Sequence, residues 1–235
     1  MKKNIKKAFL EENLHQKNSG GNKNQKKNGG NKNQKNSGGN SGVKGSTSER
    51  GTPVRSLSIN HSLTTEEVQK LLPNSGVLTY DELVAKPIKE MLNKYPDKAV
   101  VTLVRQRPSY GHYVAIYLKE EGDEQGIHIF DSYGKGFPDG HQWYNNIPSN
   151  LRKKMGEDAP YLLQRVIESG EDLYYNDFPY QHFGTENGKP ITTCGRWSVL
   201  RTQCKNLTCC QFRDLIMDLC EIMEITSDEL VCLLV

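Results

Sequence analysis

His112, Asp131 and Cys194 are residue types that together perform nucleophilic catalysis, and they occur in that order along the chain. A thiol becomes a strong nucleophile when a neighbouring imidazole takes up its proton. A carboxylate bonded to one ring nitrogen fixes the tautomer of the imidazole and stabilises its cationic form, which leaves the other nitrogen to face the thiol. The chemistry that these residues would support is acyl transfer.

Two predicted strands would position the imidazole and the carboxylate. The stretches 112–118 and 127–132, like 99–104, are rich in β-branched and aromatic residues, and an acidic, glycine-containing turn joins the first two. If this antiparallel hairpin pairs symmetrically about its turn, cross-strand partners have numbers that sum to 243, and His112 lies opposite Asp131. Their Cβ atoms would then be about 5 Å apart. A purely structural His–Asp pair is the alternative interpretation.

A predicted helix would place Cys194 in its first turn. Thr192 or Thr193 is a suitable N-cap, and apolar residues then follow at helical spacing. The helix dipole and the N–H groups of a first turn favour a thiolate, and Gly195 would let a substrate backbone approach closely. A cysteine buried for structural reasons is the alternative, and it suits the cysteines further along the chain better.

The other five cysteines are predicted to be small buried hydrophobic residues. All six lie in the last 42 residues, mostly in amphipathic helical patterns. This spread does not match a disulfide framework, and no C-x-x-C pair has a matching second pair or histidine that would form a zinc site. We therefore expect no metal and no cofactor.

An acyl-transfer site also needs hydrogen-bond donors directed at the developing oxyanion. The backbone N–H of Cys194, at the helix start, can supply one. A side-chain amide is the usual second donor. Gln181 is the first candidate for it, with Asn187 and Asn176 as alternatives.

Helical patterns precede and follow the predicted strands. Three capping boxes mark helix starts: Thr64 with Glu67, Thr79 with Glu82, and Thr208 with Gln211. The order helix, sheet, helix predicts an α+β fold, in which helices flank a mostly antiparallel central sheet. Cys194 would begin one of the core helices.

The N-terminal quarter differs from the rest of the chain. Its composition collapses to Gly, Asn, Lys, Gln and Ser, so residues 1–56 are predicted to form a disordered tail and residues 57–235 a folded domain. Residues 1–50 carry eleven Lys and one Arg against three Glu, a formal charge of +9, which leaves −6 on the remainder of a chain whose total is +3. Such an arm suits a polyanionic partner such as nucleic acid, or serves only as a solvated tail.

Neither secretion nor a membrane partner is expected. The apolar stretch 8–10, which follows the first lysines, is too short for a signal-peptide core, and no segment approaches the length of a membrane span. The protein is therefore expected to stay where it is made.

The order of the candidate residues resembles that of a known protease clan. His112 in GHY, Asp131 in FDSYG, Gln181 in YQ and Cys194 in TCGRW are similar to the motifs of the adenain-like and ubiquitin-like-protein-specific cysteine proteases. Within that clan the chain, including LTYDEL ahead of the strands, is most similar to proteases of virophages, Maverick/Polinton elements and large DNA viruses. The resemblance spans about residues 60–225 and implies an adenain-like, papain-related fold.

Two positions depart from the pattern of the clan. Many members have Trp after the catalytic His, where this chain has Tyr113, whose ring we expect to cover the imidazole. Gln181 lies 13 positions before Cys194, about twice the usual gap, so the intervening loop must fold back to bring the amide to the thiol.

The resemblance implies a cysteine endopeptidase with Cys194, His112 and Asp131 as its triad and Gln181 as oxyanion donor. It would cut capsid or scaffold precursors during virion maturation, in the virion and in the viral factory of the host cytoplasm, while residues 1–50 could hold nucleic acid. Two alternatives stay open. One is a deconjugating protease that acts on ubiquitin-like modifiers, and the other is a non-enzymatic nucleic-acid-binding protein on a protease scaffold.

Overall fold

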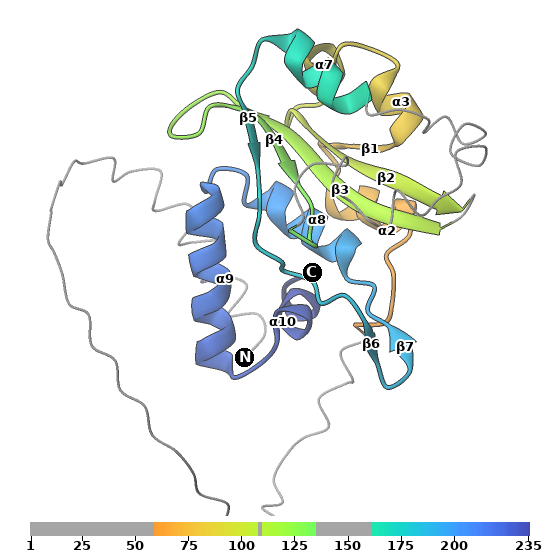
Figure 1. Cartoon of the computed structure of the whole chain (residues 1–235), viewed down its shortest axis with the longest axis vertical. Coiled ribbons are helices and arrows are strands. Elements are labelled where there is room, and N and C mark those ends of the chain that lie inside the picture. The colour runs from red at the N-terminus through yellow and green to blue at the C-terminus, as the bar shows by residue number, and fades with distance from the viewer. Residues whose placement is uncertain (1–58, 108–109, 135–160) are drawn as a thin grey trace, which may run out of the picture.

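The computed structural model (Figure 1) describes residues 59–107, 110–134 and 161–235. The predicted tail, residues 1–56, lies outside the described residues, and so does the predicted start of the domain at residue 57. In the described part, helices and a central sheet combine into an α+β fold, as predicted. None of the helices in this part is both long and apolar enough to cross a membrane.

Five strands form the central sheet, in the order β1–β2–β3–β4–β5. Their bounds are Gly76–Thr79 for β1, Ala99–Arg107 for β2, Tyr110–Lys119 for β3, Gly126–Phe130 for β4 and Leu173–Tyr175 for β5. The strands β2, β3 and β4 correspond to the three predicted strands and pair antiparallel. The sequence patterns do not predict the edge strands β1 and β5, because these are short and pair parallel to their neighbours. The sheet is therefore mixed.

Helices cover both faces of this sheet (Figure 1). Their bounds are Thr65–Leu71 for α2, Tyr80–Val84 for α3, Ile88–Asn93 for α4, Tyr161–Ser169 for α7, Cys194–Gln203 for α8, Cys209–Met223 for α9 and Ser227–Leu234 for α10. The three predicted capping boxes are confirmed, because in each the Glu or Gln side chain accepts a hydrogen bond from the threonine N–H. Thr226 and Glu229 form a fourth box, at α10.

The alternation of side chains along β3 divides the core into two parts. Tyr113 and Ala115 face the part that contains side chains of α2, α8, α9 and α10. Val114 and Ile116 face the part formed with α3, α4 and α7. This arrangement lays α8 against β3, so that the first residue of the helix lies close to the first residues of the strand.

Candidate active site

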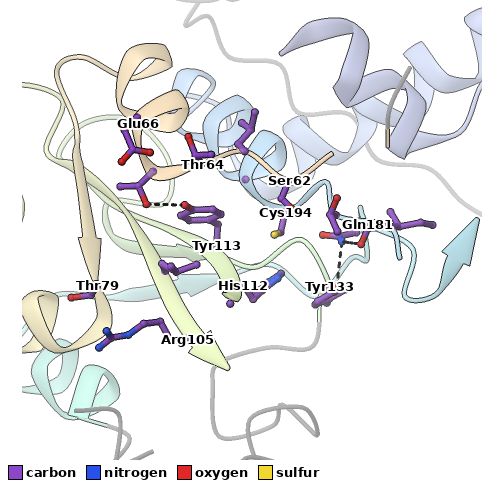
Figure 2. A pocket seen from close by; sticks show the side chains of 17 residues that line it. Ser62, Thr64, Glu66, Thr79, Arg105, His112, Tyr113, Tyr133, Gln181 and Cys194 are labelled. Carbon is purple, nitrogen blue, oxygen red and sulfur yellow. Dashed lines mark hydrogen bonds between the residues drawn. The ribbon is translucent and has the colours of Figure 1, made fainter. Parts of the chain in front are cut away.

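A cleft of about 520 Å³ opens where the start of α8 meets the first residues of β3 (Figure 2). His112, Gln181 and Cys194 line this cleft, together with Tyr133 and the start of α2. Asp131 is buried and hydrogen-bonded to His112. The fold thus brings together all four residues selected from the sequence.

His112 and Asp131 form a buried pair. Nε2 of His112 lies 2.8 Å from Oδ1 of Asp131, and the two residues are 3% and 4% exposed. The imidazole also hydrogen-bonds the side chain of Cys194. A proton on Nε2 is held by the carboxylate, and Nδ1 is then the nitrogen that exchanges a proton with the thiol. This is the arrangement that a general base needs.

The strand register that produces this pair differs from the predicted one. Ala115 pairs with Phe130, so partners sum to 245 and not to 243. Asp131 follows the last residue of β4 and lies diagonal to His112 instead of opposite. A shift of two residues keeps both side chains on one face, and a diagonal neighbour is within reach of an imidazole. The predicted contact is therefore confirmed, and the predicted pairing is wrong.

A glycine at the start of β4 lets this strand approach the segment that leads into β5. Gly126 begins β4 with a φ of 142°, and a Cβ there would come within 2.3 Å of the carbonyl oxygen of Asp172. A side chain at this position would therefore crowd the neighbouring backbone. Pattern alone centres the hairpin on its turn and does not detect this close approach.

The ring that covers the imidazole belongs to Tyr133, not to Tyr113 as predicted. Tyr133 stacks on His112 with ring centroids 4.6 Å apart and planes 15° apart. Tyr113 faces the opposite side of the sheet, because successive side chains of a strand alternate, and its hydroxyl lies 3.2 Å from that of Thr65. The sequence could have indicated this ring, because Tyr133 lies two positions after Asp131 in the FDSYG motif.

Asn176 holds the backbone of Asp131 at both of its polar groups. Its Oδ1 accepts from the N–H of Asp131 at 2.9 Å, and its Nδ2 donates to the carbonyl of Asp131 at 2.7 Å and to that of Phe178 at 3.1 Å. The amide is thus engaged in positioning the carboxylate and does not serve as an oxyanion donor. Asn187, the other alternative, is exposed between β6 (Thr185–Glu186) and β7 (Lys189–Pro190) and does not line the cleft.

Cys194 is the first residue of α8, as predicted, but the helix lacks the predicted cap. Thr193 occupies the N-cap position, and its side chain makes no capping hydrogen bond. Its hydroxyl donates instead to the carboxylate of Asp228 in α10. The side chain of Thr192 is directed elsewhere too, since its hydroxyl donates to the carbonyl of Ile59 at 3.5 Å. The N–H groups of the first turn are thereby left to the thiol and to a substrate oxygen.

The electrostatics of the site favour an ion pair between Cys194 and His112. Burial raises the pKa of the Cys194 thiol, but the charge and hydrogen bond of His112 outweigh it and hold that pKa below its usual value. Backbone hydrogen bonds from Tyr113 and Gly195 act in the same direction. Burial likewise disfavours the imidazolium, but the negative charges of Asp131 and Cys194 raise the pKa of His112 to about 10. Both shifts favour the thiolate–imidazolium form of the pair.

We expect the alkylation of Cys194 by iodoacetamide to report this ion pair. Thiolate is the reactive form, so a lowered pKa moves the midpoint of the rate–pH profile below the usual thiol value of 9.0. Each unit of lowering increases the thiolate fraction at neutral pH about tenfold, while His112 stays protonated up to about pH 10. Mass spectrometry of the alkylated peptides would give the profile, with the exposed Cys210 as internal control. A midpoint at or above 9.0 would contradict the ion pair.

Gln181 reaches the cleft because the residues between it and Cys194 form a hairpin. β6 pairs with β7, and the chain closes where the N–H of Ile191 bonds the carbonyl of Gly184. The amide Nε2 of Gln181 donates to the carbonyl of Ile191 at 3.1 Å and to the hydroxyl of Tyr133 at 3.3 Å (Figure 2). A charged substrate oxygen would compete with the longer of these bonds. The amide can thus act as a second donor by exchanging Tyr133 for the substrate.

Asp228 is a buried carboxylate that the sequence patterns do not single out. It is 1% exposed and lies in the first turn of α10. Oδ2 accepts from the N–H of His182 at 3.0 Å, and Oδ1 accepts from the hydroxyl of Thr193. The residue after Gln181 and the residue before Cys194 are thus tied to one carboxylate. An Asp in the first turn of a helix is commonly explained by the helix dipole. The sequence around Asp228 therefore gives no sign that its carboxylate also bonds residues far away in the chain.

Most of the other cysteines are less buried than expected, and Gly195 lies in tight packing. Of the five remaining cysteines only Cys204 is fully buried; Cys209, Cys220 and Cys232 are partly buried, and Cys210 is exposed. At Gly195 a Cβ would come within 3.2 Å of Leu63 and of the Tyr113 ring. A side chain at this position would therefore crowd the packing of α8 against its neighbours, whatever the glycine contributes to substrate approach.

No protein-family model matches the chain, but one comparison finds a related protein. The chain is 31% identical over 175 residues to "Uncharacterized protein V9" of Sputnik virophage, and the match covers 74% of this chain and 93% of the virophage protein. The expected relationship to virophages is thereby confirmed. The chain belongs to the same family as the V9 protein of Sputnik virophage.

Proposed function

We propose that this protein is a cysteine endopeptidase in which Cys194 is the nucleophile, His112 the general base and acid, and Asp131 the carboxylate that orients the imidazole. The observation that carries the proposal is the 2.8 Å bond between His112 and Asp131, in a pair whose imidazole also bonds a thiol at the start of a helix. A structural His–Asp pair would account for the first bond but not for the thiol with a lowered pKa in an open cleft.

Acylation begins with the thiolate of Cys194, which attacks the carbonyl carbon of the scissile bond. The carbonyl oxygen becomes an oxyanion, and the backbone N–H of Cys194 and the amide of Gln181 are the donors directed at it. The imidazolium of His112 gives its proton to the departing amine as the C–N bond breaks. The products are a thioester on Cys194 and a new N-terminus.

Deacylation reverses the role of the imidazole. His112, now neutral, removes a proton from a water molecule that attacks the thioester carbonyl. The C–S bond then breaks, the acid product leaves, and the thiolate–imidazolium pair is restored. Asp131 stays ionised throughout and stabilises the imidazolium each time it forms.

A capsid or scaffold precursor is the substrate class that we propose. Two observations support it: the motif order resembles that of viral maturation proteases, and the chain shares its family with a virophage protein. The enzyme would then act late in assembly, in the viral factory of the host cytoplasm and in the virion. The arm of residues 1–50, with its charge of +9, would hold the enzyme near nucleic acid by charge attraction.

The proposal is tested by mapping new N-termini in candidate structural proteins. Virophage structural proteins, expressed separately, would be incubated with the full-length chain and analysed by mass spectrometry. We expect discrete cleavages that disappear when Cys194 has first been alkylated. Precursors that stay intact in the presence of a reactive Cys194 would exclude the maturation role. Labelling of Cys194 by a ubiquitin-like vinyl probe in the same preparation would support deconjugation instead.

A further inference from the structure

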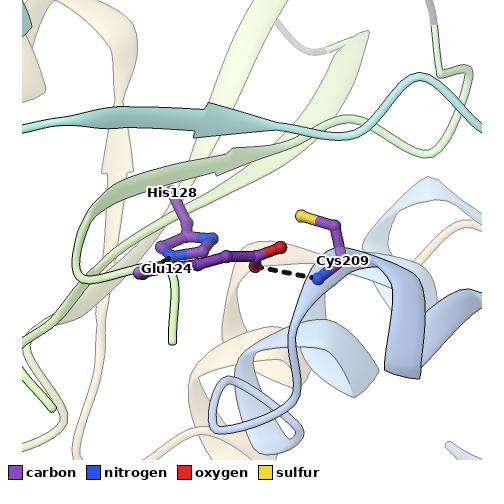
Figure 3. Close-up of side chains that lie close together, drawn as sticks. All are labelled: Glu124, His128 and Cys209. Carbon is purple, nitrogen blue, oxygen red and sulfur yellow. Dashed lines mark hydrogen bonds between the residues drawn. The ribbon is translucent and has the colours of Figure 1, made fainter. Parts of the chain in front are cut away.

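A second cluster of ligand-type side chains lies at the opposite end of the β3–β4 hairpin from His112 (Figure 3). Glu124 belongs to the turn between the two strands, His128 to β4, and Cys209 begins α9. Their potential ligand atoms all lie within 4.8 Å of one another. One carboxylate, one imidazole and one thiol therefore converge where the turn meets a helix start.

The imidazole of His128 is held in place, and one of its two nitrogens has no hydrogen-bond partner in the described part of the chain. The residue is 1% exposed, and its ring is stacked between those of Tyr117 and Tyr174, at 4.8 and 4.9 Å. Nε2 donates to the backbone carbonyl of Glu124 at 2.7 Å, whereas Nδ1 has no hydrogen-bond partner among the described residues. Figure 3 shows this second nitrogen on the side of the Cys209 sulfur and the Glu124 carboxylate. A buried acceptor without a partner is costly and needs an explanation.

The hydrogen bond of His128 is the one that metal-binding histidines make. Such residues donate their other ring N–H to a carbonyl or carboxylate, which fixes the tautomer and orients the ligand nitrogen. With its proton on Nε2, the imidazole of His128 presents the lone pair of Nδ1 to the cluster. The carboxylate of Glu124 is held nearby, because it accepts from the N–H of Cys209 at 2.9 Å.

Arg201 is a neighbouring cation that reaches the Cys209 thiol as well as groups outside the cluster. Its guanidinium donates to the carbonyls of Cys204 and Leu207 and lies over the rings of Tyr117 and Phe212. A metal ion would instead meet the carboxylate of Glu124 and a thiolate. The Cys209 sulfur would release its proton to solvent as the metal–sulfur bond forms.

We propose that Glu124, His128 and Cys209 bind one Zn²⁺ ion, with a carboxylate oxygen, Nδ1 and Sγ as ligands and solvent in the fourth position. A mixed oxygen, nitrogen and sulfur set suits zinc. Bond lengths of about 2.0–2.3 Å require tetrahedral ligands to be about 3.5 Å apart. Rotation of the Glu124 and Cys209 side chains would bring the ligand atoms from their present separations of up to 4.8 Å to this distance, while His128 stays in place.

The ion would act as a structural clamp and not as part of the candidate active site. The ten residues of α8 start at Cys194 and end at Gln203, shortly before Cys209. A helix of this length separates the two ends by about 15 Å. At that distance the ion cannot touch the reacting atoms, but it joins the β3–β4 turn to the start of α9. Zinc binding is therefore expected to raise the thermal stability of the protein.

Cobalt titration tests the site directly, because a cobalt–thiolate bond gives a charge-transfer absorption band. The full-length chain carrying Cys194→Ala, which removes the other thiol–imidazole pair, would be freed of metal by a chelator and titrated with Co²⁺. We expect one Co²⁺ per chain, the thiolate band, and displacement of Co²⁺ by Zn²⁺. No band, or a band that requires several ions per chain, would overturn the proposal.

Adjacent cysteines provide the matched variants. Cys209→Ser should abolish the band and weaken Zn²⁺ binding by at least about tenfold, and it should remove the zinc-dependent rise in Tm. Cys210→Ser, an exposed neighbour outside the cluster, should change none of these. Circular dichroism would show that both variants fold. A band that persists in Cys209→Ser would assign the metal to another thiol and overturn the site. The result does not depend on peptidase activity.

Discussion

Replacing Cys194 with alanine is expected to abolish peptide-bond cleavage, lowering kcat/KM by roughly 10⁴-fold or more. The substitution removes the sulfur that forms the acyl bond in the proposed mechanism. His112 and Asp131 would remain paired, since their 2.8 Å bond does not involve the sulfur. Hydrolysis of a peptide that spans a mapped cleavage site measures the effect.

The matched control for this loss is Cys210→Ala, which removes an exposed thiol elsewhere on the chain. It should leave kcat and KM unchanged. We expect both variants to stay folded, because Cys194 is only partly buried and Cys210 is exposed. Thermal unfolding would check this. Cleavage by Cys194→Ala above the uncatalysed rate would mean that another residue is the nucleophile, and the proposed mechanism would fail.

Replacing Asp131 with asparagine is expected to reduce kcat/KM by roughly 10²–10⁴-fold. The amide oxygen can still accept from the N–H of Tyr133, now 2.8 Å from Oδ1 of Asp131, so the turn should keep its shape. The negative charge that raises the pKa of His112 to about 10 is lost, however. The pKa of His112 then falls, the imidazolium stabilises the thiolate less, and the pKa of Cys194 rises.

Two pH profiles separate this electrostatic effect from simple unfolding. In Asp131→Asn the midpoint of Cys194 alkylation should move to higher pH, and the high-pH limb of kcat/KM, set in the wild type near the pKa of about 10 of His112, should move to lower pH. Asp177→Asn, which removes an exposed carboxylate next to Asn176, is the matched control. It should shift neither the alkylation midpoint nor the high-pH limb. A drop in activity without either movement would assign Asp131 a purely structural role.

Local patterns were sufficient for the parts of the site that lie within single elements. The alternation of strand residues put His112 and Asp131 on one face, and that prediction survived a register error because the error was an even number of residues. The position of Cys194 at a helix start followed from the apolar spacing after it. The three predicted capping boxes gave the starts of α2, α3 and α9 in the same way, since a cap involves only residues three apart.

The remaining parts of the site depend on contacts between distant segments, and only the tertiary structure decided them. The pairing of β3 with β4 is shifted by two residues from a symmetric hairpin, and Tyr133 took the stacking position expected of Tyr113. Asn176 fastened the backbone of Asp131, and Asp228 drew the hydroxyl of Thr193 away from the helix that it was predicted to cap.

The sequence by itself therefore determined which residues could do the chemistry of this protein and which faces they occupy, because periodicity and capping act over a few residues. The tertiary structure decided how they are held, because the main supporting bonds join segments far apart in the sequence, such as Asp131 with Asn176, 45 positions apart, and Thr193 with Asp228, 35 positions apart. Such bonds depend on how α10 and β5 pack around the hairpin, and no local pattern records that packing.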